Sequence, residues 1–382
     1  MSKAWSTVKL GEVVTPAQRA EAPMPGTTYR QIGVKLWGEG AYERETMDGS
    51  QTKYAQLFRA EAGDIIVNKI WARNGSVAIV TESLSGCFGS GEFPMFAPKL
   101  DRLESRWMHW LTKTPGFWAQ CDEKSQGTSG KNRIKPEQFL SVEIPLPPLA
   151  EQRRVVGRIE DLAAQIHEAQ MLRHKAAEEA EVLLRSILSH DEKAKPTPMR
   201  ELVKLRAPDV TVRADETYQF AGVYCFGRGV FKAARKSGMD FAYPRVTRLR
   251  AGEFVYPKLM AWEGALGVVP PECDGCVVST EFPVFEVIEN RVLPEVLDTY
   301  FRTPSIWPQI AGESTGTNVR RRRLNPQDFL DYEMPLPTRE TQMTLRKVRA
   351  EVDALKRLQA ETAAELDALL PAILDRAFKG EL

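Results

Sequence analysis

Cysteine is scarce in this chain, with five residues among 382, and histidine is scarcer still, with four. The cysteines have no framework spacing, which fits a reducing compartment and argues against a disulfide-built domain. Cys273 and Cys276 form a lone Cys-x-x-Cys, but no second pair of ligands follows at zinc-finger spacing. We expect ordinary buried thiols there. The histidines have neither metal nor triad spacing, and surface positions on helices account for them better than catalysis does.

Long apolar runs are also missing. No segment approaches the roughly 18 residues of a membrane span, and residues 1–5 lack the apolar region of a signal peptide. These absences predict a cytoplasmic protein without membrane association. The net charge of +1 lacks the basic excess typical of a protein that holds nucleic acid alone through its phosphates. The length and the 43% hydrophobic content allow two cores.

The motifs of nucleotide-driven and methyl-transferring enzymes are absent as well. No glycine-rich loop ends in Gly-Lys-Ser or Gly-Lys-Thr, and Gly130-Lys131 lacks both the leading glycine and the following hydroxyl residue. An amino-methyltransferase needs an Asn/Asp-Pro-Pro-aromatic loop, and neither Pro147-Pro148 nor Pro270-Pro271 has that context. We therefore expect no catalytic residue, no metal site and no cofactor site in this chain.

What the chain does have is an internal repeat about 190 residues apart. Its register is constant to within one residue, which chance matches between short motifs would not maintain. The paired landmarks include Gly33 with Gly222, Gly63 with Gly252, Glu92-Phe93-Pro94 with Glu281-Phe282-Pro283, Gly127-Thr128 with Gly316-Thr317, and Ile144-Pro145-Leu146-Pro147 with Met334-Pro335-Leu336-Pro337. A unit of this length far exceeds a solenoid repeat, so each copy is expected to be a domain with its own core.

Both copies combine short strands with helices. Runs typical of strands occupy residues 64–67 and 76–80 in the first copy and 253–256 and 266–269 in the second. Helices are predicted at 104–111 and 295–301, each stopped by a Thr-Pro dipeptide. The predicted fold class is α+β, with two repeated, mainly antiparallel-sheet domains at residues 1–148 and 193–338.

After each Pro-Leu-Pro the hydrophobic pattern becomes helical. Across residues 149–192, apolar residues recur at alternating steps of four and three, from Val155 through Leu183 to Ile187. About 40 residues at about 1.5 Å each give a rod near 60 Å. A second rod is predicted over 339–382, with Leu355 and Leu369 on its apolar side and Pro371 kinking or loosening its end. Because each apolar stripe needs a partner, the rods are predicted to form a two-helix antiparallel coiled coil that separates the domains about a pseudo-twofold axis.

Basic and polar residues gather on equivalent loops of the two copies. Such residues suit both major-groove reading and phosphate contact, although a run like 320–323 alone also fits a solvated surface. We predict DNA-binding roles for Lys69, Arg73, Lys131, Asn132, Arg133 and Lys135 in the first copy, and for Lys258, Asn318, Arg320, Arg321, Arg322 and Arg323 in the second. Trp71 and Trp262 fit a core position as well as a functional one.

The segment Ile144-Pro145-Leu146-Pro147-Pro148-Leu149-Ala150-Glu151-Gln152-Arg153 precedes a long helix and is echoed by Met334-Pro335-Leu336-Pro337 with Gln342. This combination resembles the specificity subunit of Type I restriction-modification systems. Gly63-Asp64-Ile65-Ile66 with Lys69, the Glu-Phe-Pro triplets, and Gly127-Thr128 before Arg133 and Phe139 support the resemblance. It covers the whole chain.

The resemblance implies a non-catalytic subunit with two target recognition domains, each reading one half of a split double-stranded DNA sequence. It also implies two modification subunits that bind S-adenosylmethionine and methylate adenine N6, and two motor-nuclease subunits that use ATP and Mg. Docking of the modification subunits is predicted at Pro145, Pro147, Gln152, Pro335, Pro337 and Gln342. Residues 338–341 depart from 148–151, so docking there is expected to differ.

The unlike basic loops of the two copies imply two different half-sites and hence an asymmetric target. The competing interpretation is a protein-interaction scaffold, with two adaptor domains on a coiled coil and no role in DNA binding. The position of basic loops, rather than apolar patches, at equivalent places favours DNA.

Overall fold

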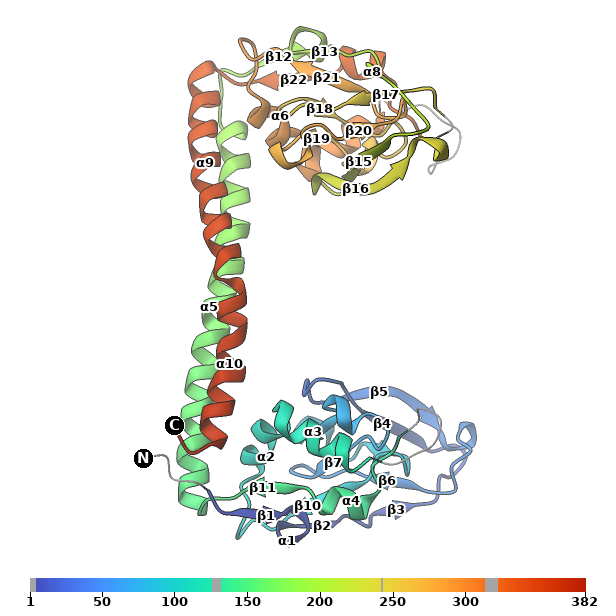
Figure 1. Ribbon diagram of the computed structural model, residues 1–382, viewed down its shortest axis with the longest axis vertical. Coiled ribbons are helices and arrows are strands. Elements are labelled where there is room, and N and C mark those ends of the chain that lie inside the picture. Colours follow the sequence, from blue (N-terminus) through green and yellow to red (C-terminus); the bar gives the residue numbers. More distant parts are fainter. Residues whose placement is uncertain (1–4, 126–131, 242, 313–321) are drawn as a thin grey trace. The chain divides into compact units, whose positions relative to one another are not determined.

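The computed structural model describes residues 5–125, 132–241, 243–312 and 322–382. The chain folds into two compact units, one formed by Met1–Met171 with Thr362–Leu382 and the other by Leu172–Glu361. Each unit contains one globular domain and parts of the long helices (Figure 1). The predicted α+β organisation in two related domains is confirmed.

The strands of the first domain are short and lie in three sheets. They are β1 (Thr7–Lys9), β2 (Val14–Pro16), β3 (Ala20–Glu21), β4 (Thr28–Val34), β5 (Ala41–Asp48), β6 (Leu57–Arg59), β7 (Ile65–Val67), β8 (Val77–Ile79), β9 (Phe88–Gly89), β10 (Met95–Pro98) and β11 (Glu143–Pro145). The sheet orders are β1-β11, β2-β10-β7-β8 and β3-β6-β9-β4-β5. Of the described pairings in this domain, β4 with β9 is parallel and the others are antiparallel.

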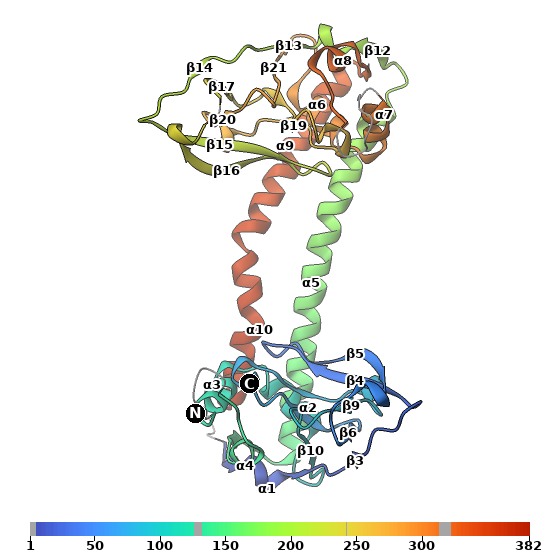
Figure 2. The same cartoon turned by 90° about the vertical axis from the view of Figure 1, so that its right-hand side faces the viewer.

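The second domain repeats this arrangement strand for strand. Its strands are β12 (Lys195–Pro198), β13 (Val203–Leu205), β14 (Val210–Thr211), β15 (Thr217–Tyr224), β16 (Gly229–Ser237), β17 (Arg245–Arg248), β18 (Phe254–Val255), β19 (Gly267–Val268), β20 (Val277–Val278), β21 (Val284–Val287) and β22 (Glu333–Leu336). The orders are β12-β22, β13-β21-β18-β19 and β14-β17-β20-β15-β16. The β4-β5 and β15-β16 hairpins (Figure 2) even share a register shift at equivalent residues. The internal repeat of the sequence is therefore also a repeat of the three-dimensional structure.

The helices follow the predicted pattern, with one correction described below. They are α1 (Leu10–Val13), α2 (Ser105–Leu111), α3 (Pro115–Glu123), α4 (Pro136–Leu140), α5 (Leu149–Ser189), α6 (Pro294–Phe301), α7 (Trp307–Gly312), α8 (Pro326–Asp331), α9 (Arg339–Glu361) and α10 (Ala363–Phe378). Short 3-10 turns are η1 (Gly49–Gln51), η2 (Ala72–Asn74), η3 (Glu82–Leu84), η4 (Met199–Glu201), η5 (Gly238–Asp240), η6 (Ala261–Glu263), η7 (Pro271–Cys273) and η8 (Pro304–Ile306). The predicted helices at 104–111 and 295–301 are confirmed as α2 and α6.

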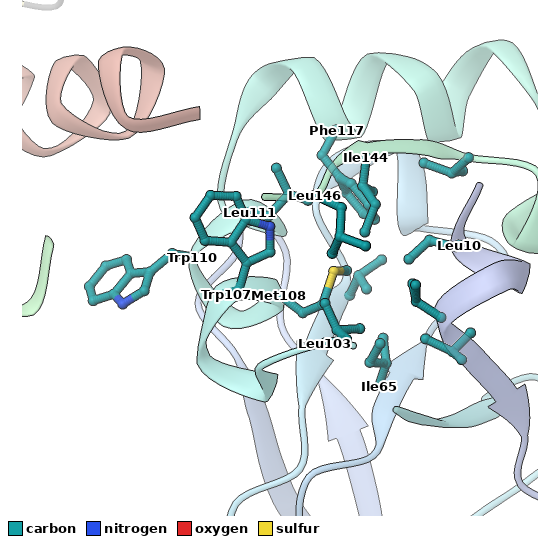
Figure 3. Close-up of a cluster of buried hydrophobic side chains, with 14 of the residues drawn as sticks. Leu10, Ile65, Leu103, Trp107, Met108, Trp110, Leu111, Phe117, Ile144 and Leu146 are labelled. Atoms are coloured by element: carbon teal, nitrogen blue, oxygen red, sulfur yellow. The ribbon is translucent and has the colours of Figure 1, made fainter. Parts of the chain in front are cut away.

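The first domain and the start of α5 share one core (Figure 3). Trp107 of α2 is fully buried in it, and its indole Nε1 donates a hydrogen bond to the carbonyl of Pro145 at 3.0 Å. Val155 and Ile159 of α5 belong to the same cluster. The Pro-Leu-Pro strand of the first domain is therefore held by packing, because its end lies between α2 and the long helix.

The second domain has an equivalent core that is richer in aromatic rings. Phe329 of α8 is fully buried and packs against Phe254, Phe285 and Phe301 at ring-centroid distances of 5.4, 5.0 and 5.5 Å. The repeat-related residue of the first domain, Phe139, is buried as well. The phenylalanine that the repeat preserves in residues 136–140 and 326–330 is therefore a core anchor.

The long helices pack in antiparallel fashion within each unit. In the first unit, Gln170 of α5 donates to Asp367 of α10 at 3.2 Å, and Ile159 of α5 shares a core with Leu374 of α10. In the second unit, Lys356 of α9 pairs with Glu181 of α5. Residue numbers increase along α5 and decrease along the helix beside it, so the two helices run antiparallel, as predicted. Within the described residues, no helix combines the length and the apolar character that crossing a membrane requires.

The second rod is not one continuous helix. It breaks at Thr362, whose φ of −96° and ψ of 2° leave the helical region, whereas Pro371 lies inside α10 and does not end it. The predicted kink or loosening at Pro371 stays a prediction, and the break at Thr362 was not predicted. Threonine is β-branched and has a lower helix propensity than residues such as alanine or leucine. An interruption of the helix at Thr362 therefore costs little stability.

The prediction that three particular leucines lie on the buried apolar sides of the long helices is wrong. Leu183, Leu355 and Leu369 are exposed, whereas Leu184 and Leu374 are buried. A heptad pattern drifts around an α-helix by about 20° per repeat, so residues adjacent to the expected position enter the contact.

Candidate nucleic-acid interface

A buried ion pair sets the start of the strand that leads to each predicted lysine. Gly63 lies in the left-handed region with φ of +86°, and Asp64 after it is buried and binds Arg19 at 2.6 Å. In the second domain Glu253 is buried and binds Arg206 at 2.7 Å. The shared glycine-acid motif is therefore structural, since it fixes the starts of β7 and β18, and the predicted lysines follow the opposite ends of these strands.

Lys69 and Lys258 occupy the same junction in the two domains. The N–H of Lys69 donates to the carbonyl of Glu92 at 3.1 Å, and the carbonyl of Lys69 accepts from Ile134 at 2.9 Å. Lys258 makes the same two bonds, at 3.0 and 2.9 Å. Each lysine thus lies where a strand end, the Glu-Phe-Pro loop and the basic loop meet.

The arginines of the basic loops bind the glutamates of the Glu-Phe-Pro triplets. Arg133 Nε donates to a carboxylate oxygen of Glu92 at 3.1 Å, and Arg323 pairs with Glu281 in the same way. Lys258 Nζ lies 3.9 Å from the other Glu281 oxygen. Exposed pairs of this kind contribute only about 0 to 1 kcal/mol, so they orient the arginines without preventing exchange to an external anion. The glutamates were not among the predicted site residues.

The other predicted DNA-binding residues are only partly described. Lys131, Asn318, Arg320 and Arg321 lie outside the described residues. Asn132, Arg73 and Arg322 are half-buried, and Lys135 is exposed at the start of α4. Trp71, left open between core and function, is 44% exposed beside Lys69, whereas Trp262 is half-buried.

The glutamines predicted to dock a partner subunit have a structural role instead. The Gln152 side chain is buried, accepts from the N–H of Glu104 at 2.9 Å, and donates to two carbonyls at 2.9 and 2.8 Å. Gln342 makes the equivalent three bonds. Pro147 and Pro337 are buried as well. These side chains join each domain to its helix, and Pro337 also lines the groove beside Pro335.

Pro145 and Pro335 keep exposed surface, and each lines a groove within its own unit. The groove volumes are about 370 and 570 Å³. Both grooves lie between the Thr-Pro turn, the Pro-Leu-Pro strand and the last turns of a long helix, which is α10 in the first unit and α5 in the second. Docking at these two prolines stays a prediction.

The predicted buried thiols are confirmed, and one histidine differs from expectation. Cys273 and Cys276 are buried in the second domain, and burial is the main cause that raises the pKa of Cys273 to about 11. Among the described residues, no three His, Cys, Asp or Glu side chains cluster as metal ligands. His167 and His174 are exposed on α5 as expected, and His190 is exposed just after its end, but His109 is half-buried on α2.

The stability of the first unit is expected to depend on the protonation of His109. Burial and the nearby Lys113 charge lower its pKa to about 4, against about 6.5 when unfolded. Between these values the unfolded state binds more protons, so the free energy of unfolding should fall as pH drops from 6.5 toward 4 and be retained above 6.5. Urea denaturation of wild type and His109→Gln at pH 7 and 4.5 measures this, with an expected differential of on the order of 1 to 3 kcal/mol. An equal wild-type-to-variant difference at both pH values would contradict it.

Comparison with known proteins places the chain beside restriction-modification components. Residues 2–173 match the family model described as Type I restriction modification DNA specificity domain. The Type I restriction enzyme EcoEI specificity subunit of Escherichia coli is 25% identical over 175 residues. That alignment covers 42% of this chain and 28% of the relative, so this chain spans less than a third of the relative's length.

Two solved structures share the fold over nearly the whole chain. The HsdS subunit from Thermoanaerobacter tengcongensis has a TM-score of 0.59 at 23% identity, with 99% of this chain and 97% of that chain covered. A chain solved in work on the complex assembly and conformational transition of the type I R-M system has a TM-score of 0.66 at 21% identity, with 100% of both chains covered. At these identities the likeness establishes the fold.

Proposed function

The chain carries a Type I restriction modification DNA specificity domain in residues 2–173, and on this basis we propose that it is the DNA-reading subunit of a restriction-modification complex. Its two domains read the two halves of a split, asymmetric sequence on double-stranded DNA. The subunit specifies the sequence, and the catalytic groups for methylation and cleavage belong to partner subunits.

One observation carries this proposal: a single backbone arrangement supports two different sets of side chains. In both domains a lysine and a loop arginine gather around the same glutamate at the end of an equivalent strand. The neighbouring positions differ, since Asn68 and Trp71 are replaced by Pro257 and Met260. Two different half-sites require a common set of phosphate contacts and different base contacts. Equivalent basic residues on a shared backbone can supply the first, and the unlike neighbouring side chains can supply the second.

The two grooves beside Pro145 and Pro335 support the partner part of the proposal. Two modification subunits, which bind S-adenosylmethionine and methylate adenine N6, dock there, and motor-nuclease subunits that use ATP and Mg join them. Equivalent grooves suit two copies of one partner. In the second unit Asp191 accepts from the N–H and the hydroxyl of Thr338, at 2.8 and 3.0 Å, where the first unit has Pro148. The second contact is therefore expected to differ in shape.

The test is methylation mapping of single DNA molecules from cells that co-express this chain with a modification subunit. A split adenine-containing motif is the expected result. Absence of any chain-dependent motif, with both proteins expressed and folded, would overturn the proposal and favour a protein-interaction scaffold.

Spacing of the half-sites is expected to follow the length of the helices. Seven extra residues in α5, about two helical turns, with seven more in α9 or α10, add about 10 Å. The methylated motif should keep both halves while its spacer grows by about three base pairs at 3.4 Å each. The same seven residues added after Leu382 serve as the control. An unchanged spacer in a folded, active variant would exclude the helices as the measure of spacing.

A further inference from the structure

The first domain has a cavity of about 240 Å³ that the basic loops do not explain. It is smaller than the roughly 300 Å³ at which pockets for drug-sized ligands begin, so it suits a group no larger than a single nucleobase. Polar and aromatic side chains from β4, β5 and the two loops beside Lys69 line it, and they include Gln31, Arg44, Thr52, Asn68, Trp71 and Glu92.

The second domain treats the equivalent positions differently. Gln31 faces Phe88 across the parallel β4-β9 pairing, and the corresponding pairing of β15 with β20 joins Phe220 to Val277. The position of Thr52 is taken by Phe241. The rings of Phe220 and Phe241 pack 5.0 Å apart in an apolar cluster with Val277. Two polar cavity-lining residues of one domain are thus packed aromatic rings in the other.

Two side-chain amides, those of Gln31 and Asn68, line the cavity beside hydroxyl and charged groups. Within the described part of the chain, the Gln31 side chain makes no hydrogen bond, and Asn68 uses only its oxygen, which accepts from the N–H groups of Ile70 and Trp71. Arg44, the arginine that lines the cavity, pairs with Glu45 at 3.1 Å, and Arg133 pairs with Glu92, which also lines it. An amide offers one donor and one acceptor side by side, which matches adenine N6 and N7, whereas guanine O6 and N7 call for two donors.

Aromatic surface flanks these amides. Trp71 is 44% exposed and Tyr54 is 53% exposed, and both line the cavity. Exposed aromatic side chains provide a stacking surface for a base.

We propose that this cavity is the base-specific site of the first domain, that it takes an adenine of the first half-site, and that Gln31 and Asn68 determine that specificity. The proposal rests on the proposed DNA-reading function and adds that the two domains recognise their half-sites by different means. In the second domain Phe220 and Phe241 pack together at the equivalent positions, so its half-site is read by other contacts.

The test transplants the second-domain residues into the first domain. Gln31→Phe with Thr52→Phe is made in the full chain, co-expressed with its modification subunit, and the methylated motif is mapped on single DNA molecules. One adenine position in one half-site should lose its preference, and methylation of the original motif should fall roughly 5- to 150-fold, as expected for one base contact. The other half-site and the spacer should stay unchanged.

Smaller changes guard against a folding defect of the double variant. Gln31→Ala and Asn68→Ala remove the amides without adding volume, and Gln18→Ala, an exposed glutamine of the same domain, is the matched control. Both cavity variants should relax the same adenine position, and the control should not. The proposal is overturned if the folded cavity variants methylate the same motif, whether at the wild-type rate or uniformly more slowly. It is also overturned if base preference relaxes in both half-sites. Failure of the wild-type chain to direct any split motif would instead overturn the proposed function.

Discussion

Alanine in place of Arg323 is expected to lower the affinity of the complex for its target DNA by about 1 to 3 kcal/mol, roughly 5- to 150-fold. Arg323 stays 44% exposed in its pair with Glu281, beside Lys258. Because that surface pair is worth little, a DNA acceptor with better geometry can replace the carboxylate. Arg133 with Glu92 should behave likewise at the other half-site.

Salt titration separates the two ways in which Arg323 can contribute. Loss of a phosphate contact weakens binding to all sequences and reduces the salt slope by about one, whereas loss of a base contact relaxes specificity at one position. Arg291→Ala is the matched control, since Arg291 is a half-exposed arginine of the same domain paired with Glu201. Equal affinities for wild type and Arg323→Ala at physiological salt would remove this arginine from the interface.

Replacement of Asp298 by alanine is expected to cost the second unit about 3 to 5 kcal/mol of unfolding free energy. Asp298 lies on α6 and is buried, and its carboxylate accepts from Arg302 at 3.0 Å and from Arg349 of α9 at 3.1 Å. Arg349 is itself only 15% exposed. Removing the carboxylate leaves a buried guanidinium with Asp353 as its remaining described partner. Chemical denaturation of the full chain measures the loss.

The first unit supplies the design for a rescue. The repeat-related position of Arg349 is Ile159, which is fully buried, so an apolar residue is compatible with this contact between helix and domain. Adding Arg349→Ile to the Asp298→Ala variant should restore most of the stability, because a buried charge without its partner is then no longer present. Asp215→Ala, at an exposed pair with Arg213, should change stability by less than about 1 kcal/mol. A failed rescue would assign the loss to the other two groups that donate hydrogen bonds to Asp298, which are Arg302 and the Val268 N–H.

The DNA-binding site stays a prediction, and the structure adds residues to it. Lys69, Lys258, Arg133 and Arg323 were predicted because basic residues recur in equivalent loops of the repeat, and the structure brings each lysine and arginine to the same junction. Glu92, to which Arg133 binds, lies 41 residues earlier in the chain, and no local pattern connects them. The cavity lined by Gln31 was also missed, since only the pairing of β4 with β9 and the folding of the loops bring its walls together.

The helix errors have a comparable origin. The pattern predicted a seam through Leu183, but Leu184 is the residue that contacts the core of the second domain. Periodicity indicates that a helix has an apolar side. Which of two adjacent residues is buried depends on the surface that packs against the helix. Gln152 was assigned to a partner subunit because a polar residue in a repeated motif suggests a surface, yet it is buried and binds backbone groups inside the domain.

The repeat, the two α+β domains, the long helices and the resemblance to restriction-modification specificity subunits all followed from the order of residues, because repeats, helical periodicity and turn residues are properties of neighbouring positions. The partners of Arg133, the burial of Gln152 and the unlike interiors of the two domains followed only from the folded chain. Burial, ion pairing and cavity shape depend on segments that are distant in sequence and meet only when the sheets and helices pack.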